Sequence, residues 1–578
     1  MQSVMRRLCR AAAQRESAPG APRGAPSRAP RPTLRALAWR LGLLAFLLLA
    51  ATGLCARPRL LLAGGHLPVC TSAAPEACER GRAPSAAAQR ERFRLDAAAL
   101  KRVGAGGWLP QRSAAKKRLV GALTRWHQRA GTIHLPGDDL APALAGGSSR
   151  DARAWTDLAD FERDRVWDAL EREPLQERVD LAASIDDSSV HIFREFVAMA
   201  RAISGRERPH ILISTASGRD PFASIEFYRA VFEQAGGQAR WLPLDHALRA
   251  AQLDAQRNCA QLDRLRGEHL AAHDRDRLYP QRAAQMAAAC SDPARLDALI
   301  DWADGVFLNG GDQSFMRAAW FATDGAPSPQ LRRLLARLDA GALVLGGTSA
   351  GTAVQAARPT HGRAAMIVSG SGIPGLPATA ITGLPPYPDC AAAQACAGFD
   401  PDTLLYHPGG GLGSFGLGVL DTHFSDRGRD YRLTRLLIDS GTAVGVGIDE
   451  TTALRIDVED GALLGRVIGR GGVSVMQRID DTLVLRRRYL PDEVLELAPA
   501  VPPIPVCVDG DGAAEEVSVD GDPLRHWLDA VRADLIWHPL VLTAGTDREV
   551  AGSVCAAPDG RSRWWRLPAA TGNHRATE

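Results

Sequence analysis

The sequence lacks the patterns that mark a metal protein. It contains no C-x-x-C pair among its 10 cysteines, and its histidines do not cluster near the cysteines. Structural zinc sites take cysteine and histidine ligands at short, regular spacings. The sequence therefore predicts no bound metal, and none of the motifs described below requires an organic cofactor.

A strong net charge is also lacking. The 578 residues carry a formal net charge of +3. Much of the positive charge is local, because residues 1–40 hold nine arginines and a single acid, Glu16. Without that segment the chain is slightly acidic. Nucleic-acid-binding proteins need a basic surface, so we expect no nucleic-acid partner.

No apolar run reaches the roughly 20 residues that a membrane-spanning helix requires. The most apolar segment, Leu41–Leu54, follows the arginine-rich start and is bracketed by Arg40 and Arg57. This pattern is typical of a signal peptide, here residues 1–56. An uncleaved N-terminal anchor is the alternative and would be the expected membrane contact. We therefore expect an exported protein, periplasmic or secreted.

The cysteine count favours export. Cleavage near Cys55–Ala56 leaves eight of the 10 cysteines, and an even number after an export signal favours disulfide bonds. Pairing between close neighbours is a hypothesis, since eight cysteines allow many connectivities. Free buried cysteines in a cytosolic enzyme are the alternative. The predicted pairs are Cys70–Cys78, Cys259–Cys290, Cys390–Cys396 and Cys507–Cys555.

Residues 343–351 carry the most informative pattern in the chain. They read Leu-Val-Leu-Gly-Gly-Thr-Ser-Ala-Gly, so an apolar strand runs directly into Ser349, which small residues flank. A serine hydroxyl projects from a strained strand-to-helix turn only where its neighbours are small. Ser349 is therefore the candidate nucleophile of a nucleophile elbow. The alternative is an ordinary strand–turn–helix corner in a chain rich in glycine and alanine.

A histidine and an acidic pair each follow a later apolar strand. His423 and Asp449–Glu450 stand at these strand ends, and parallel strands bring such ends to one edge of a sheet, where open α/β folds build their sites. His423 is the candidate base. Adjacent side chains point to opposite sides, and we favour Glu450 over Asp449 as the acid. The order Ser, His, acid differs from the Ser, acid, His of α/β-hydrolases.

The strand and helix patterns alternate along the chain. Strands are expected near Leu60–Ala63, His210–Ser214 and Ala239–Leu242, with a helix at Ile225–Ala235. This rhythm predicts an α/β fold with a mostly parallel sheet and flanking helices.

The chain is too long for one minimal domain. We expect a main domain over residues 57–490, with a helical insertion at about 80–185 between its first two strands. A C-terminal extension is expected over residues 491–578.

Four blocks of sequence resemble the signature blocks of the cyanophycinase family of serine peptidases, which includes dipeptidase E. These blocks are Phe307–Gln313, Gly346–Gly351, Asp421–Leu433 and Gly447–Ala453. The resemblance begins near Leu60–Gly65 and ends near Val475. It implies a fold like that of class I glutamine amidotransferases. One departure is Thr422, because the family usually has glutamine there; the other is the length of the chain.

The resemblance also implies roles for residues around the candidate triad of Ser349, His423 and Glu450. The amides of Gly311 and Ala350 would form an oxyanion hole. The residues implied in substrate binding are Gln313, Asp421, Thr422, Arg427, Arg429, Arg432 and Thr451. Arg429 and Arg432 are three apart on one helix face, which favours a ligand role for a substrate carboxylate. A solvated helix face is the alternative for the arginines, and turn capping is the alternative for Gln313.

The expected function is that of a serine exopeptidase working through an acyl-enzyme. Its expected partner is a peptide or polymer substrate: cyanophycin, a polymer of β-aspartyl-arginine units, or related aspartyl peptides. An α-aspartyl dipeptidase and a non-catalytic binding module that retains the fold are the alternatives. Glutamine amidotransferase chemistry is excluded because it uses cysteine at the elbow. The oligomeric state stays open, a homodimer included.

Overall fold

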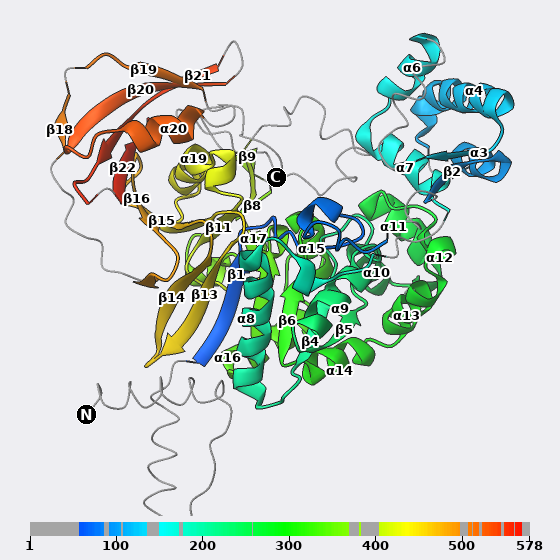
Figure 1. Ribbon diagram of the computed structural model, residues 1–578, viewed down its shortest axis with the longest axis horizontal. Coiled ribbons are helices and arrows are strands. Elements are labelled where there is room, and N and C mark those ends of the chain that lie inside the picture. The colour runs from blue at the N-terminus through cyan, green and yellow to red at the C-terminus, as the bar shows by residue number, and fades with distance from the viewer. Residues whose placement is uncertain are drawn as a thin grey trace, which may run out of the picture.

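The computed structural model describes thirteen segments of the chain (Figure 1). They are residues 57–85, 92–105, 108–135, 149–172, 177–256, 258–368, 381–382, 404–497, 507–510, 512–518, 523–544, 548–559 and 561–568. The predicted signal peptide and the predicted Cys390–Cys396 pair lie outside these residues. The architecture is mixed α/β, with two large sheets and helices packed against them.

The central sheet has eight strands among the described residues. In spatial order they are β17 (Val494–Glu496), β14 (Ala462–Gly469), β13 (Thr452–Glu459), β1 (Arg57–Ala63), β7 (Val344–Thr348), β6 (Gly305–Leu308), β4 (His210–Ser214) and β5 (Gln238–Leu242). Five neighbouring strands run parallel; in spatial order they are β1, β7, β6, β4 and β5. The pairs on the other side of β1 are antiparallel. The predicted parallel arrangement therefore describes five of the strands, within a mixed sheet.

Helices cover both faces of the parallel part, and the strands are apolar for that reason. Along β1, Leu61 and Ala63 join the core under α8 (Asp187–Ser204) and α9 (Ile225–Gln234), whereas Leu60 and Leu62 face the opposite core. Successive side chains of a strand point to opposite faces. The opposite face is covered by α10 (His246–Leu253), α14 (Ala294–Trp302), α15 (Gln313–Trp320) and α16 (Pro329–Asp339).

A second sheet carries the strands that precede His423 and Glu450. Its strands are, in order, β11 (Val419–Thr422), β12 (Val444–Ile448), β15 (Val473–Arg478), β16 (Leu483–Tyr489), β22 (Ser562–Arg566), β21 (Arg548–Ala556), β20 (Ile536–Ala544) and β18 (Val508–Asp509), with β19 (Glu515–Ser518) also on β20. Only the β11–β12 pair and the two pairs on β20 that involve β18 and β19 are parallel. The expectation that one parallel sheet delivers serine, histidine and acid is therefore wrong.

The C-terminal strands complete this second sheet, because β22 pairs with β16. Helix α19 (Asp430–Ser440) packs on it through Leu433, Leu436 and Leu437. Helix α20 (Pro523–Ala530) joins the same core through Leu528. A small third sheet consists of β8 (Met366–Ile367), β10 (Leu405–His407) and β9 (Ile381–Thr382).

The helical insertion forms a body with its own core, at the far side of the central sheet from the C-terminal strands (Figure 1). It contains β2 (Phe93–Leu95), α3 (Ala97–Gly104), α4 (Ser113–Ala130), β3 (Ile133–Leu135), α6 (Ser149–Thr156) and α7 (Asp160–Leu170). Its core includes Leu119, Trp155 and Val166. Next to it lie α11 (Leu262–Leu270) and α12 (Arg275–Leu278), and α13 (Pro280–Ser291) follows farther from the insertion (Figure 1).

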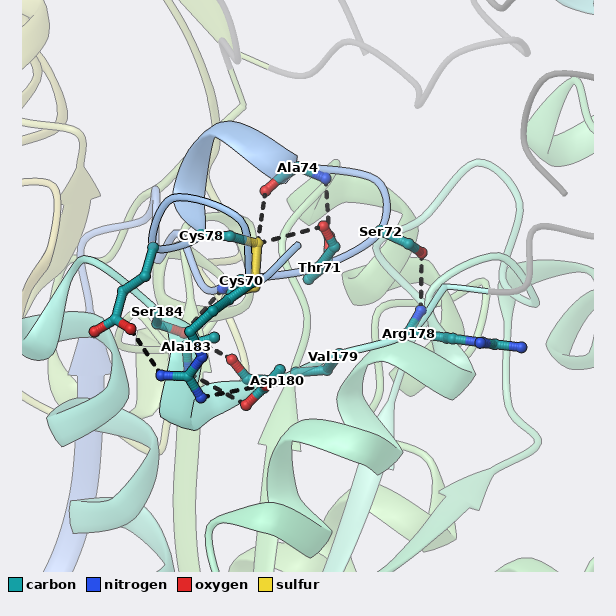
Figure 2. The surroundings of a disulfide bond; sticks show 12 residues. Cys70, Thr71, Ser72, Ala74, Cys78, Arg178, Val179, Asp180, Ala183 and Ser184 are labelled. Atoms are coloured by element: carbon teal, nitrogen blue, oxygen red, sulfur yellow. Dashed lines mark hydrogen bonds and ion pairs between the residues drawn. A yellow bond between two sulfur atoms is a disulfide. The ribbon is translucent and has the colours of Figure 1, made fainter. Parts of the chain in front are cut away.

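Three disulfides form between the predicted neighbours Cys70 and Cys78, Cys259 and Cys290, and Cys507 and Cys555. Within the described segments no cysteine is free. Figure 2 shows that the Cys70–Cys78 loop lies against residues 178–184, with Cys70 N donating to Ser184 Oγ at 2.9 Å. Disulfides are typical of oxidising compartments. A search of the described helices finds none that is both long and apolar enough to cross a membrane.

Candidate active site

Ser349 occupies a tight turn between β7 and α17 (Ala350–Ala353). Its backbone angles are φ +52° and ψ −117°. The neighbouring glycines are required by close packing, since a Cβ on Gly347 would lie 2.3 Å from the Gly351 carbonyl oxygen and a Cβ on Gly351 would lie 2.2 Å from that of Leu308. Side chains at these positions would displace the turn. The small residues around Ser349 therefore have a steric cause in this fold.

Ser349, His423 and Glu450 form a connected chain of side chains. Ser349 Oγ lies 2.9 Å from His423 Nε2. His423 Nδ1 lies 2.6 Å from Glu450 Oε1. These distances are within hydrogen-bond range. The structure thus brings together the three residues that the sequence predicts as a triad.

The end of β1 joins the two sheets at this point. Ser349 N donates to Ala63 O at 3.1 Å, His423 N donates to Gly64 O at 2.8 Å, and Thr451 N donates to Gly65 O at 3.0 Å. A Cβ on Gly65 would lie 2.4 Å from His423 Nε2. The backbone at the end of β1 therefore holds the serine from one sheet against the histidine and the acid from the other.

Backbone strain occurs after each of the strands that lead to the triad. Four non-glycine residues with positive φ lie at the ends of β1, β7, β11 and β12: His66 at +44°, Ser349 at +52°, His423 at +49° and Thr451 at +50°. Each such conformation costs on the order of 1–3 kcal/mol and persists only where the surroundings enforce it. Strain of this kind is typical of functional sites.

The surroundings of His423 favour its neutral form. Burial lowers its pKa, and the nearby charges of Arg427 and Arg429 lower it further, while the hydrogen bond to Glu450 opposes the shift; the net pKa lies below the ordinary value of 6.5. A neutral imidazole can accept a proton at neutral pH. The site therefore contains a base beside the serine hydroxyl.

Asp449 and Glu450 serve different purposes. Asp449 accepts hydrogen bonds from Ser425 N at 2.9 Å, Gly472 N at 2.8 Å and Arg488 Nη2 at 2.6 Å. It is buried and ties three segments together. Glu450 is the acid that reaches His423, as the sequence predicts.

The glycine turn after β6 lies beside the serine. A Cβ on Gly310 would be 3.5 Å from Ser349 Cβ. Gly311 has φ +142°, and a Cβ there would lie 2.2 Å from Ser217 O. Within the described part of the chain, the amides of Gly311 and Ala350 donate to no protein acceptor. Both amides are therefore available to a ligand.

The predicted carboxylate clamp is wrong for Arg432. Arg432 binds Asp421 with two hydrogen bonds, from Nε at 2.8 Å and from Nη2 at 2.5 Å. Both side chains are buried. Asp421 is therefore not a substrate ligand either, because the pair satisfies itself inside the protein.

Arg429 also points inward. Its Nη1 donates to Thr422 O at 2.6 Å, and burial, together with Arg432, lowers its pKa to about 9. Thr422 and Thr451 are buried, so neither presents a side chain at an open surface. The half-buried Arg427 is the predicted arginine that stays accessible, and its charge acts on His423.

Gln313 starts α15 next to the glycine turn, but its amide nitrogen is already used. It donates to Ile367 O at 2.9 Å and to Val368 O at 3.1 Å. Gln313 therefore attaches the third sheet to the site, which differs from the expected direct substrate contact.

Sequence reasoning missed Ser217, which supports the glycine turn. Ser217 accepts from Asp312 N at 2.8 Å, and Ser217 N donates to Asn309 Oδ1 at 3.1 Å. The short run of small and polar residues Thr215–Gly218, directly after β4, is a signal of the same kind as the other strand ends. In the described segments, no group of three or more His, Cys, Asp or Glu side chains has the arrangement of a metal site.

Comparison with known proteins supports a peptidase-like region. No protein-family profile matches the chain. A cyanophycinase of Synechococcus elongatus is 30% identical over 176 residues, which make up 30% of this chain and 42% of that protein. The cyanophycinase of Geminocystis herdmanii is 29% identical over 171 residues, 30% of this chain and 48% of that protein. The cyanophycinase of Nostoc sp. is 28% identical over 185 residues, which make up 32% of this chain and 49% of that protein.

The chain therefore spans about half the length of the curated relatives it matches. Among solved structures, the crystal structure of a peptidase from an acI-B1 Actinobacterium aligns with 54% of this chain and 91% of its own, at 15% identity and a TM-score of 0.31. That likeness is too distant to support an argument about the site.

Proposed function

We propose that the protein is an exported serine peptidase that hydrolyses an amide bond through an acyl-enzyme. The observation that supports this most directly is the chain of contacts from Ser349 Oγ to His423 Nε2 and from His423 Nδ1 to Glu450 Oε1, at 2.9 and 2.6 Å. Nucleophile, base and orienting acid within hydrogen-bond reach are the signature of this chemistry. The turn at Ser349 serves as the nucleophile elbow.

In the proposed mechanism, Ser349 Oγ attacks the carbonyl carbon while its proton passes to His423 Nε2. Glu450 accepts a hydrogen bond from His423 Nδ1–H, which fixes the tautomer, and its charge balances that of the imidazolium. The amides of Gly311 and Ala350 donate to the oxyanion. His423 then protonates the leaving amine, the C–N bond breaks, and the acyl group stays on Ser349 as the acyl-enzyme. Water then attacks the acyl carbon while one of its protons passes to His423. His423 returns that proton to Ser349 Oγ as the ester bond breaks, which releases the acid and restores Ser349.

We propose cyanophycin, or a related β-aspartyl-arginine peptide, as the substrate. Three relatives that match part of the chain are named cyanophycinases. Such a polymer presents a free arginine carboxylate on each repeat. The half-buried Arg427, close enough to lower the pKa of His423, has the charge to hold that carboxylate. An α-aspartyl dipeptidase is the alternative within the same chemistry.

Export accords with the three disulfides and with the apolar segment near the start of the sequence. We propose a periplasmic or secreted location.

The test is hydrolysis by purified protein of insoluble cyanophycin and of α-aspartyl dipeptides, with Ser349→Ala as the matched variant. We expect release of β-aspartyl-arginine by the wild type and none by Ser349→Ala, with the thermal unfolding midpoint preserved. Cleavage of dipeptides alone would favour the alternative substrate. Substantial turnover by Ser349→Ala would remove the serine from the mechanism.

A further inference from the structure

A buried network of charges joins the helical insertion to the body of the protein. Asp168, near the end of α7, accepts hydrogen bonds from both terminal nitrogens of Arg219, each at 2.9 Å. It also accepts from His273 N at 2.8 Å. Asp168 is only 1% exposed. Burial alone would raise its pKa, but Arg219 and Arg275 lower the pKa below the ordinary value. The carboxylate is therefore charged and fully engaged.

A second buried arginine also links the insertion to the loop after β4. Arg275, 1% exposed, donates from Nη1 to Glu171 Oε2 at 2.7 Å and to Asp220 Oδ2 at 2.8 Å. Its Nη2 lies 3.2 Å from Asp168. Glu171 directly follows α7, and Asp220 directly follows Arg219. Two successive residues of the loop after β4 are thus held by acids of the insertion, one directly and one through Arg275.

The same loop supports the glycine turn beside Ser349. Ser217 lies two residues before Arg219. Its backbone carbonyl accepts a hydrogen bond from Asp312 N, and its backbone amide donates one to Asn309 Oδ1. A Cβ on Gly311 would lie 2.2 Å from Ser217 O, so the two backbones touch. A shift of the loop therefore moves Gly311 or leaves a gap behind it.

We propose that Asp168 is a positioning residue for the oxyanion hole: through Arg219 it fixes the Ser217–Asp220 loop and thereby the direction of the Gly311 amide. This inference rests on the proposed function, because it assumes that Gly311 donates to an oxyanion. It gives the helical insertion a part in the chemistry, although the insertion supplies none of the reacting groups.

The chain offers a matched control on the same helix. Glu162 of α7 is likewise buried and binds Arg112 with two hydrogen bonds, from Nε at 2.7 Å and from Nη2 at 2.6 Å. Arg112 belongs to the insertion itself and lies just before α4. Asp168→Asn and Glu162→Gln each neutralise one buried acid of α7, but only the first loosens the loop.

The experiment compares the two variants with the wild type in three measurements. These are thermal unfolding, kcat and KM for release of β-aspartyl-arginine from soluble cyanophycin, and the rate at which a small fluorophosphonate labels Ser349. A misplacement of about 1 Å far from the chemistry can cost on the order of 100-fold in rate. We expect both variants to unfold at lower temperature. Only Asp168→Asn is expected to lose 10- to 100-fold in kcat and in labelling rate, with KM unchanged.

Equal kcat values for the two variants would overturn the positioning role, as would a loss in KM alone. If Asp168→Asn does not fold, Arg219→Lys takes its place, since lysine keeps the charge but cannot make both hydrogen bonds. Retention of wild-type kcat and labelling by folded Arg219→Lys would also count against the proposal. Failure of the wild type to react with the fluorophosphonate would instead overturn the proposed function, so the two failures are distinguishable.

Discussion

The packing of Gly65 against His423 leads to a quantitative prediction for Gly65→Ala. The added Cβ would lie 2.4 Å from Nε2 and Cε1 of the imidazole, whereas ordinary contact begins at 3.4 Å, so the ring must retreat by about 1 Å. The ring is held at 2.9 Å from Ser349 Oγ and 2.6 Å from Glu450 Oε1. A shift of this size disrupts at least one of these contacts. A misplacement of about 1 Å costs on the order of 100-fold in rate.

Gly65→Ala should also lower the free energy of unfolding. Gly65 has φ +109°, and a non-glycine residue in such a conformation costs on the order of 1–3 kcal/mol. Gly81 separates the two effects, because it has φ +81° but no heavy atom within 4 Å of the Cβ position. Gly81→Ala therefore carries the backbone cost without the contact with His423.

The assay measures kcat/KM for cyanophycin hydrolysis, the fluorophosphonate labelling rate and the free energy of unfolding for both variants. We expect both variants to lose stability, Gly65→Ala by more because of the added contact with His423, and we expect the loss of rate to be confined to Gly65→Ala. If folded Gly65→Ala labels at the wild-type rate, or if the control variant loses as much activity, then Gly65 does not hold the ring in the way described.

Four further predictions concern charged residues and thiols. Removal of the Arg427 charge raises the pKa of His423, so Arg427→Ala should move the acidic limb of the kcat/KM profile to higher pH; a lower or unchanged limb would contradict the electrostatic argument. The same variant should weaken the binding of carboxylate-bearing substrates by about 1.5–3 kcal/mol relative to the binding of neutral substrates, as measured by KM. Arg432→Ala should instead lower the free energy of unfolding by up to about 3–5 kcal/mol, because it breaks a buried ion pair and leaves Asp421 with the longer contact to Arg429, at 3.5 Å. Chemical denaturation measures this, and a neutral result would mean that the pair is dispensable. Alkylation and mass spectrometry of denatured, unreduced protein should find no free thiol among the six cysteines of the three disulfides, and modification of any of them would exclude its bond.

The sequence predicts the local part of the site well, because that part follows from short-range rules. Ser349, His423 and Glu450 each follow a short apolar strand, and small residues around Ser349 indicate a tight turn. What sequence pattern does not determine is which strands pair, since any buried strand can satisfy its hydrogen bonds with several partners. In the structure β11 and β12 belong to a second sheet, and backbone hydrogen bonds to the carbonyls at the end of β1 help to hold the residues that follow these strands against Ser349.

Side-chain direction is the second limit. The three-residue spacing of Arg429 and Arg432 indicates a shared helix face, but not whether that face meets water or protein. In α19 nine consecutive residues, Asp430–Ile438, are buried, so both faces meet protein and Arg432 finds Asp421. The acids of α7 likewise have the pattern of a solvent-exposed polar helix surface. Their burial could not be predicted, because their arginine partners are distant in the sequence.

The position of β1 in the central sheet has a consequence for when the proposed active site can form. This strand stands near the start of the described chain, yet its two neighbours are β7 and β13, with Leu60 beside Leu345 and Leu61 beside Arg455 (Figure 1, the blue strand beside the yellow ones). Pairings this distant along the chain form slowly, because a very long loop must close first. The ribosome must finish residue 450 before Ser349, His423 and Glu450 can meet. A nascent chain therefore holds Ser349 for many residues before His423 and Glu450 exist, and the proposed activity cannot appear until all three have been made.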